Sequence, residues 1–285
     1  MDPPLLRACP GRLRSTRSLH KSGVCMLRRI AFLIVLGVSV VLSGYAQSLD
    51  HTGCEGIPTT LNCKLVDDFE ADAPGDPPGK WRALNDREPV PLTKGDMMTE
   101  RKNVYVQEEE NNHFARIFTD ARGLRAVVPL ENGALNWNLD KRPILQWKWR
   151  ARDLPKGGNE KKGSTNDTGG ALYVTFGTDW LGRPKSIKYT YSSTLSVGTT
   201  VDYGPLKVLV VASGAEQGTR KWIRHERNVI EDYRELFGDA PDKTPSGIAI
   251  WSDSDTLNEM ATIDFDDILV LSGPSEGESS PASPK

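Results

Sequence analysis

The 285-residue sequence has few of the residues and motifs that mark common enzyme classes. It contains only four histidines and four cysteines. It has neither the His-Glu-x-x-His pair of zinc peptidases nor the Gly-rich phosphate loop of nucleotide-binding enzymes. These absences exclude the activities that those motifs support. Glycoside hydrolysis needs only two suitably spaced carboxylates, and a sequence with 38 Asp and Glu residues does not exclude it.

The sequence also lacks an apolar run of the roughly 20 residues that a transmembrane helix needs. A mainly apolar run covers residues 30–42, after Arg28 and Arg29 and before the small residues Gly44 and Ala46. This order is typical of a secretory signal peptide, and it predicts export and a mature chain that starts near Gln47. The alternative is an uncleaved signal that anchors the same domain outside the membrane.

Two details refine the expected leader. A lipoprotein signal needs a cysteine just after the small residues, and Tyr45 stands there instead. Residues 1–25 are Arg-rich without apolar periodicity, so we expect the true start at Met26; an unusually long charged start to the signal is the alternative. Residues 1–46 are therefore expected to be a signal peptide. After its cleavage we expect no stable membrane anchor and a periplasmic or secreted location.

Positive charge is scarce once this leader is removed. Residues 47–285 contain 29 Lys and Arg against 37 Asp and Glu, a net charge of −8. Binding to nucleic acid and to anionic membranes depends on cationic side chains, so neither is an expected partner. Neutral or cationic partners fit this charge better.

Cysteine is equally scarce in the expected mature chain. Cys9 and Cys25 lie in the leader, and only Cys54 and Cys63 remain. In an oxidising compartment, this close pair predicts a disulfide bond. A zinc site is not expected, because His51 is near but no second Cys/His pair lies at ligand spacing.

Short segments in which apolar and polar residues alternate dominate the region 65–271. They cover residues 65–69, 113–118, 145–151, 171–176, 187–191, 206–212, 222–227, 247–251 and 262–271. Because Gly, Pro, Asn and Asp separate them and regular helices do not, they predict an all-β domain, a two-sheet antiparallel β-sandwich. We expect a polar leader at residues 47–64 and a disordered tail at residues 272–285.

One helix is expected within this domain. Asn228 is a candidate N-cap with Glu231 three residues later, and Gly238 is a candidate end. We interpret the segment as a crossover helix that covers an open end of the sandwich. The alternative is that Tyr233 and Arg234 line a ligand site.

Several segments, taken together, have a specific pattern. They are Gln146-Trp147-Lys148-Trp149-Arg150, Leu154-Pro155-Lys156-Gly157, residues 172–176, Ile187-Lys188-Tyr189, Trp222 with Glu226-Arg227-Asn228-Val229, Asp232-Tyr233-Arg234 with Phe237-Gly238, and Gly247-Ile248-Ala249-Ile250 with Asp253 and Asp255. This set resembles a bacterial family of exported proteins known as domain of unknown function 3047. The resemblance covers most of residues 65–271. The family has no established activity, so the resemblance implies no catalytic residues.

Acidic residues cluster at both ends of the domain. Asp68 and Glu70 follow its first apolar residues, and Asp266 and Asp267 lie in its last segment. This pattern is similar to jelly-roll, galactose-binding-like carbohydrate-binding modules, whose first and last strands commonly hold a structural calcium ion. If these strands are neighbours, Glu70 and Asp267, followed by Asp68 and Asp266, are the candidate calcium ligands. The alternative is that these acids are solvated.

The same pattern makes a specific prediction about Asp267. Period-two alternation places it on the face of Ile263, Phe265 and Leu269. Asp267 therefore either points inward or lies at a β-bulge.

Aromatic residues supply the candidate ligand-binding side chains. Trp147, Trp149, Tyr189, Tyr191 and Trp251 either pack in the core or form a platform on which sugar rings stack. Trp180 lies in a loop and is the ring most expected to be exposed. The candidate ligand-binding set is Trp180, Tyr189, Tyr191 and Trp251.

Two charged loops need interpretation. Residues 253–259 alternate acids without the spacing of an EF-hand, and we interpret them as an acidic hairpin loop. Residues 156–163 are expected to be a solvated loop, with an active-site lid as the alternative.

The expected function is a non-catalytic extracytoplasmic binding module for glycan or cell-envelope material, with calcium as the candidate cofactor. The alternative is an envelope polysaccharide hydrolase or lyase that uses a pair of loop carboxylates. A structural role in the envelope is a third interpretation. A pocket with two carboxylates about 5 to 10 Å apart favours the enzyme. An open groove with exposed rings and no acid pair favours binding.

Overall fold

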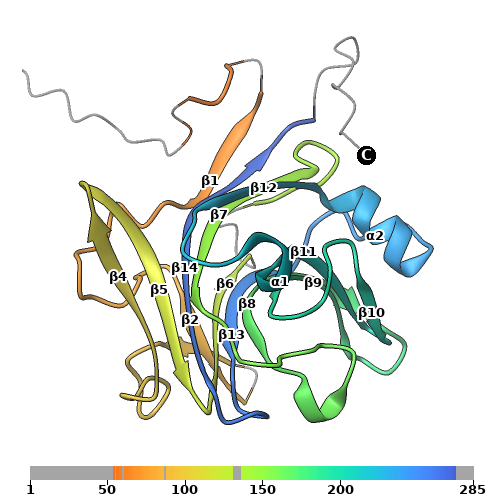
Figure 1. Ribbon diagram of the computed structural model, residues 1–285. Coiled ribbons are helices and arrows are strands. Elements are labelled where there is room, and N and C mark those ends of the chain that lie inside the picture. Colours follow the sequence, from red (N-terminus) through yellow and green to blue (C-terminus); the bar gives the residue numbers. More distant parts are fainter. Residues whose placement is uncertain (1–53, 55, 60, 87, 131–135, 274–285) are drawn as a thin grey trace, which may run out of the picture. The chain divides into compact units, whose positions relative to one another are not determined.

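The computed structural model describes residues 54, 56–59, 61–86, 88–130 and 136–273. The expected signal peptide, the start near Gln47 and nearly all of the expected tail lie outside these residues. Within them the chain forms two β-sheets and a few short helices (Figure 1). No helix in this part of the chain is long and apolar enough to cross a membrane.

One sheet has six strands. They are β1 (Cys63–Asp67), β4 (Lys102–Glu109), β5 (Asn112–Asp120), β7 (Ile144–Asp153), β12 (Ile223–Asn228) and β14 (Met260–Leu271). Their order is β12-β7-β14-β5-β4, and β1 pairs with the end of β14. Every pair in this sheet is antiparallel.

The other sheet has eight strands. They are β2 (Arg82–Asn85), β3 (Glu88–Pro91), β6 (Gly123–Pro129), β8 (Thr168–Thr178), β9 (Pro184–Ser192), β10 (Thr200–Tyr203), β11 (Leu206–Ser213) and β13 (Gly247–Asp253). Their order is β10-β11-β9-β8-β13-β6-β2-β3. All pairs are antiparallel except β9 with β11, which run parallel.

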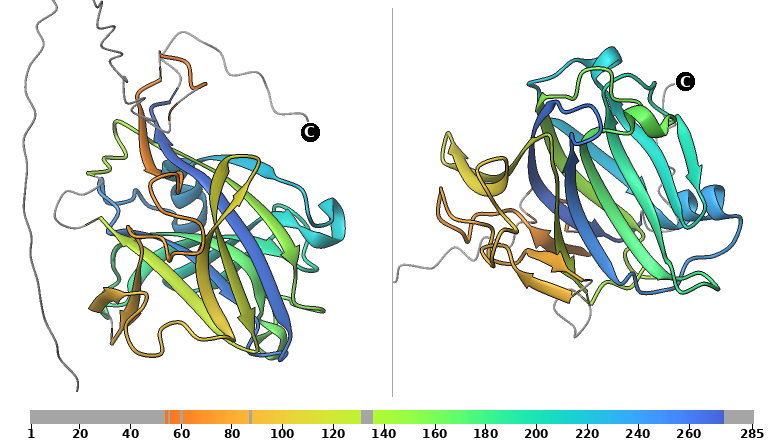
Figure 2. Two further views of the ribbon diagram at one scale, coloured as in Figure 1. Left: turned by 90° about the vertical axis from the view of Figure 1, so that its left-hand side faces the viewer. Right: turned by 90° about the horizontal axis from the view of Figure 1, so that it is seen from below.

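The two sheets form the layers of a sandwich, with one continuous hydrophobic core between them (Figure 2). Alternation along β7 shows how the sequence specifies this arrangement. Leu145, Trp147 and Trp149 are buried in the core, whereas Lys148 and Arg150 point to the outer face. The predicted two-sheet β-sandwich is confirmed.

The expected crossover helix is also present. Helix α2 (Val229–Phe237) begins at Asn228, whose side chain accepts hydrogen bonds from the N–H groups of Ile230 and Glu231. It ends at Gly238, which has the left-handed backbone that favours glycine there. The other helices, η2 (Gly163–Thr165) and α1 (Gly214–Gln217), are single turns.

The first and last strands are neighbours, which is the condition on which the calcium prediction depends. Strand β1 pairs with β14 and begins at Cys63, inside the expected polar leader. Strand β14 is irregular between Asp266 and Leu269, and Asp267 has a positive φ of 46°. Asp267 therefore lies at a β-bulge, one of the two arrangements that the alternation allowed. Beyond it, Ile268 and Val270 face the core, while Leu269 lies in a separate apolar cluster.

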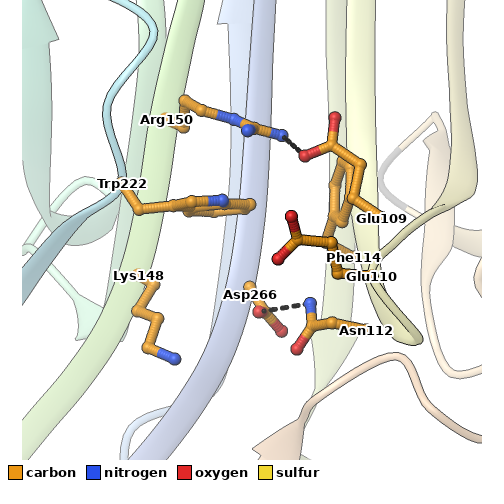
Figure 3. Close-up of a pocket in the computed structure, with 8 residues that line it drawn as sticks. All are labelled: Glu109, Glu110, Asn112, Phe114, Lys148, Arg150, Trp222 and Asp266. Carbon is orange, nitrogen blue, oxygen red and sulfur yellow. Dashed lines mark hydrogen bonds and ion pairs between the residues drawn. The ribbon is translucent and has the colours of Figure 1, made fainter.

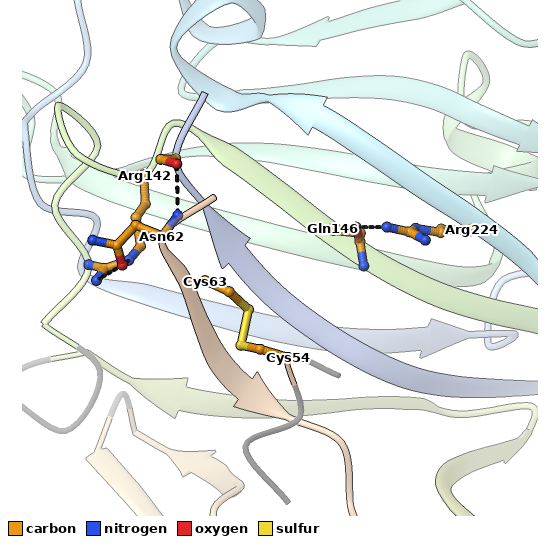
Figure 4. The surroundings of a disulfide bond; sticks show 7 residues. Cys54, Asn62, Cys63, Arg142, Gln146 and Arg224 are labelled. Atoms are coloured by element: carbon orange, nitrogen blue, oxygen red, sulfur yellow. Dashed lines mark hydrogen bonds between the residues drawn. A yellow bond between two sulfur atoms is a disulfide. The ribbon is translucent and has the colours of Figure 1, made fainter. Parts of the chain in front are cut away.

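The predicted disulfide joins Cys54 to Cys63 at the start of β1, with the two Cα atoms 6.0 Å apart (Figure 4). Asn62 connects the same segment to the rest of the domain by hydrogen bonds. Its carbonyl oxygen Oδ1 accepts from Arg142 Nε at 3.1 Å, and its backbone N–H donates to Ser272 Oγ at 2.9 Å. The start of the described chain is thus held covalently and by hydrogen bonds.

One loop interpretation needs correction. Residues 253–259 do not form a hairpin, because they connect β13 of one sheet to β14 of the other. Most of the 156–163 loop is exposed, as expected for a solvated loop, but Glu160 within it is fully buried. Its carboxylate accepts from Ser192 Oγ at 2.6 Å and from Thr168 Oγ1 at 3.2 Å, which satisfies the buried charge.

Candidate functional site

A groove of about 620 Å³ lies on the outer face of the six-stranded sheet. It is called the outer groove below, and Figure 3 shows the eight residues that line it. They are Glu109, Glu110, Asn112, Phe114, Lys148, Arg150, Trp222 and Asp266. The groove therefore combines aromatic rings with both signs of charge.

Strand alternation places the floor of the outer groove. Phe114 in β5, Arg150 in β7 and Asp266 in β14 each alternate with residues that face the core. Because β7, β14 and β5 are adjacent, side chains far apart in sequence meet on this face.

The tight turn between β4 and β5 forms one rim of the groove. Glu110 and Asn111 both have positive φ, 55° and 64°, as expected for a two-residue hairpin turn. The turn places the Glu110 side chain over the groove, between the Trp222 ring and Asp266 (Figure 3). Glu110 and Asn112 are exposed, so their side-chain oxygens can accept hydrogen bonds from a ligand.

Trp222 forms the opposite wall, and its ring is fixed by two contacts. The Arg150 guanidinium lies 4.5 Å from the ring centroid, and the edge of Phe114 meets the ring at a centroid distance of 5.4 Å. Lys148 and Asp266 lie on the other side of the ring (Figure 3). Trp222 is 37% exposed, so a rigid aromatic surface borders the groove.

A charge cluster beneath the groove holds Arg150 in place. The fully buried Asp264 carboxylate accepts from Arg116 Nε at 2.6 Å and from Arg150 Nε and Arg152 Nε, each at 2.9 Å. Glu109 pairs with Arg150 at 2.8 Å. One buried anion thus organises three cations, and Glu109 offsets part of the remaining positive charge.

The pKa of Glu109 reflects this cluster. Burial alone would raise it, but the hydrogen bonds and charges of Arg150 and Arg152 outweigh burial and hold the pKa below its usual value. Glu109 is therefore a fixed anion at neutral pH.

Asp266 has the opposite shift. It is only 3% exposed, and burial, followed by repulsion from the Asp267 carboxylate, raises its pKa to about 7. Asn112 Nδ2 donates to Asp266 Oδ2 at 3.1 Å. The groove therefore contains one carboxyl group that is partly protonated at neutral pH.

The predicted aromatic ligand residues are not brought together. Tyr189 and Tyr191, with 0% and 1% exposure, are core residues, so their prediction as a sugar platform is corrected. Their hydroxyls donate to Asp232 Oδ2 at 2.8 Å and to the Gly218 carbonyl at 2.5 Å, which removes the cost of burying them. Trp180 is 87% exposed, as expected for a loop ring, but does not line the outer groove.

The predicted calcium residues do converge in part. Asp68, Glu70 and Asp267 line one pocket of about 310 Å³, but Lys148 and Arg224 line it too. Lys148 pairs with Asp267, and these cations offset the negative charge that would attract a metal ion.

Two of the calcium candidates, Glu70 and Asp266, interact with other parts of the protein. Glu70 Oε1 accepts from the His113 N–H at 2.8 Å, and Asp266 belongs to the outer groove. In the described residues, one group of three acids can bring its oxygens within 4.8 Å of one another, and it consists of Asp167, Asp253 and Asp255. Calcium binding at Glu70 and Asp267 stays a prediction.

Most residues of the outer groove could not be identified from the sequence. Trp222 lies at the start of an alternating segment, and Glu110 and Asn112 belong to no motif. The consecutive Glu110-Asn111 pair between two alternating segments is a usable turn signal, because Asn tolerates positive φ. Nothing in the sequence indicates that this turn and Trp222 line one groove, since that arrangement depends on strand order.

The fold and the outer groove define the class: a two-sheet β-sandwich protein with an aromatic, charged groove on one outer face. A model of the family described as protein of unknown function (DUF3047) matches residues 96–269, more than half of the chain, and the chain therefore belongs to this family. A search of curated proteins finds no match.

Solved structures with some likeness include two carbohydrate-binding modules. The family 11 module of the cellulase Lic26A-Cel5E of Clostridium thermocellum has a TM-score of 0.36 and 10% identity, over 74% of this chain and 95% of that chain. A module specific for non-crystalline cellulose, CBM28, has a TM-score of 0.34 and 8% identity, over 68% of this chain and 87% of that chain.

An exo-β-agarase has a TM-score of 0.39 and 9% identity, over 74% of this chain and 25% of the agarase. At these low TM-scores and identities, the likenesses support no conclusion about function.

Proposed function

We propose that this protein is an exported binding module for glycan or cell-envelope saccharide, and that the outer groove is its binding site. The observation that carries the proposal is the exposed Trp222 ring, held rigidly by Arg150 and Phe114 beside a groove of about 620 Å³. A flat ring next to hydrogen-bonding groups matches a sugar, which has apolar C–H faces and polar edges.

The polar groups of the outer groove suit a ligand with many hydroxyl groups. Glu110 and Asn112 offer acceptor oxygens on one rim, and Lys148 offers donors on the other. A sugar hydroxyl both donates and accepts, so it satisfies all of these groups. The ion pairs of Arg150 with Glu109 and of Lys148 with Asp267 reduce the net charge, which favours a neutral or weakly charged saccharide.

Export is part of the proposal and rests on the signal-peptide pattern of residues 26–46. N-terminal sequencing of protein from the periplasm or medium is expected to find a start at or close to Gln47. A mature protein that retains Arg28 and Arg29 would show that the leader is not cleaved there.

A glycan-array screen of the mature chain tests the binding function. Wild-type protein is expected to bind one or more envelope or polysaccharide fragments, and Trp222→Ala is expected to lose that signal. Trp180→Ala is the matched control, because its ring is also exposed but does not line the groove. Binding that survives Trp222→Ala, or no binding to any saccharide, contradicts the proposal.

One observation favours a second function, that of a hydrolase or lyase acting on envelope polysaccharide. Asp266, with a pKa of about 7, can donate a proton at neutral pH, and the Glu110 side chain lines the same groove. A protonated acid and an ionised carboxylate are the two groups that glycoside hydrolysis requires. Release of reducing ends from the array hits, lost in Asp266→Asn while binding persists, would establish the enzyme. Intact saccharide after long incubation favours the binding module.

A further inference from the structure

The pocket of about 310 Å³ that contains Asp68, Glu70 and Asp267 adjoins the outer groove. It is called the side pocket below. Asn112 and Lys148 line both the side pocket and the outer groove. The two hollows are therefore neighbouring parts of one surface.

Strand alternation shows that the two hollows follow one another along the strands. In β7, Gln146 lines the side pocket, Lys148 lines both hollows and Arg150 lines the outer groove. Beside β7, Trp222 lines the outer groove, and Arg224, which pairs with Lys148, lines the side pocket. From Gln146 to Arg150 a strand advances about 13 Å, which is longer than a single sugar ring.

The β-bulge in β14 forms the floor where the two hollows meet. Consecutive strand residues normally point to opposite faces, but the bulge lets Asp266 line the outer groove while Asp267 lines the side pocket. Lys148 pairs with Asp267, and Asn112 Nδ2 donates to Asp266 Oδ2 at 3.1 Å. Figure 3 shows Lys148 and Asn112 on the two sides of Asp266. The shared residues therefore border the junction from both sides.

The two hollows differ in chemistry. The outer groove has the rings of Trp222 and Phe114, whereas none of the described residues that line the side pocket is aromatic. In the side pocket the Arg224 guanidinium donates to the Gln146 amide oxygen, and Ile57 adds apolar surface (Figure 4). The outer groove thus offers stacking, and the side pocket offers mainly hydrogen bonds.

Both hollows contain charges of both signs. Their linings together hold six acids and three cations, and Arg116 and Arg152 lie close by in the Asp264 cluster. A chain with a negative charge on every unit would meet carboxylates in both hollows, and a fully cationic chain would meet Lys148 at the junction. Because like charges in contact weaken binding, an uncharged chain fits both hollows best.

We propose that the outer groove and the side pocket form one site for a linear, uncharged oligosaccharide longer than a disaccharide. One unit stacks on Trp222, and a later unit of the same chain forms hydrogen bonds with Arg224 and its neighbours in the side pocket. This inference rests on the proposed function of the outer groove and adds the class of its ligand.

Titration calorimetry of the mature chain tests chain length. The probes are cellohexaose, N-acetylchitohexaose and mannohexaose, each with its disaccharide, and hexagalacturonate as the anionic chain. EDTA in every titration keeps calcium out of the side pocket. At least one uncharged hexasaccharide is expected to bind about 30-fold more tightly than its disaccharide, more than its several overlapping disaccharide units explain. Hexagalacturonate is expected to bind more weakly.

Variants separate the two hollows. Arg224→Ala changes the side pocket alone, so the affinity for the hexasaccharide is expected to fall about ten-fold and that for the disaccharide to stay within about two-fold. Trp222→Ala is expected to weaken both ligands. Glu226→Ala is the matched control, because Glu226 is also exposed in β12 but is not among the described residues that line either hollow. Melting curves confirm that each variant is folded.

The outcomes distinguish this inference from the proposed function. If the hexasaccharide and its disaccharide bind equally and Trp222→Ala weakens both, the outer groove binds saccharide but the extended site is wrong. The extended site is also wrong if Arg224→Ala weakens both ligands equally or neither of them, or if hexagalacturonate binds as tightly as the uncharged chains. If no probe binds, or if Trp222→Ala leaves the affinities unchanged, the proposed function fails together with the extended site.

Discussion

Replacing Asp264 by asparagine is expected to destabilise the domain more than neutralising any exposed acidic residue. The carboxylate is fully buried and accepts from Arg116, Arg150 and Arg152. The amide has nearly the same shape but no charge, and its NH₂ group can donate only toward other donors. Three guanidinium groups would then remain close together, with Glu109 as their nearest partner.

The magnitude follows from the cost of breaking a buried ion pair. Removing one partner of such a pair costs about 3 to 5 kcal/mol. For a domain of this size, 1 kcal/mol corresponds to roughly 2 to 4 °C in Tm, so Asp264→Asn is expected to lower Tm by about 6 to 20 °C. The measurement is thermal unfolding, monitored by differential scanning calorimetry.

The matched control is Asp120→Asn. Asp120 pairs with Arg101 at 2.9 Å in the same sheet, but both side chains are about 40% exposed. Such surface pairs contribute about 0 to 1 kcal/mol, so this variant is expected to change Tm little. Adding Arg116→Gln to Asp264→Asn is expected to restore part of the loss, because it removes one of the uncompensated cations. If Asp264→Asn costs no more than Asp120→Asn, the assigned role of Asp264 is wrong.

Three further predictions concern stability. Because the pKa of Asp266 is raised from 3.8 to about 7, the folded state holds this proton more tightly, and stability is expected to fall as pH rises from about 4 to about 7. Asp266→Asn is expected to remove up to about 4 kcal/mol of that loss, seen as a higher Tm at pH 8 with little change at pH 4. Serine in place of Cys54 and Cys63 is expected to cost about 2 to 3 kcal/mol, and labelling of both thiols in the native protein would show that the disulfide is absent. If calcium binds at Glu70 and Asp267, chelation lowers Tm by the equivalent of about 2.7 kcal/mol at a hundredfold excess over Kd, and Asp267→Asn abolishes the effect. A melting curve that the chelator leaves unchanged, in protein shown to retain no trapped metal, contradicts calcium binding at Glu70 and Asp267.

The layers of the fold could be predicted because they depend on local patterns. Alternation in β7 placed Trp147 and Trp149 on one face and Lys148 on the other, and Asn228 with Gly238 marked the ends of α2. Several strands were missed, among them β4 and β6. Strand β4 pairs locally with β5 across a two-residue turn, whereas β6 pairs with β13, which lies far away in the sequence.

The functional sites were harder to predict, because each depends on which strands become neighbours. The outer groove needs β12, β7, β14 and β5 side by side before Trp222 and Glu110 can line it together. This arrangement has no periodic signal in the sequence. The same limit explains Tyr189 and Tyr191, whose rings were candidates for a sugar platform but lie in the core, with their hydroxyls donating to groups within the domain.

Isothermal titration calorimetry of Trp222→Ala and Trp180→Ala with the strongest saccharide from the array tests binding at the outer groove most directly. Loss of a central aromatic contact costs about 2 kcal/mol, so Kd is expected to rise about 30-fold in Trp222→Ala and to stay within about two-fold of wild type in Trp180→Ala. Equal affinities for Trp222→Ala and wild type, or a loss confined to Trp180→Ala, would contradict binding at the outer groove.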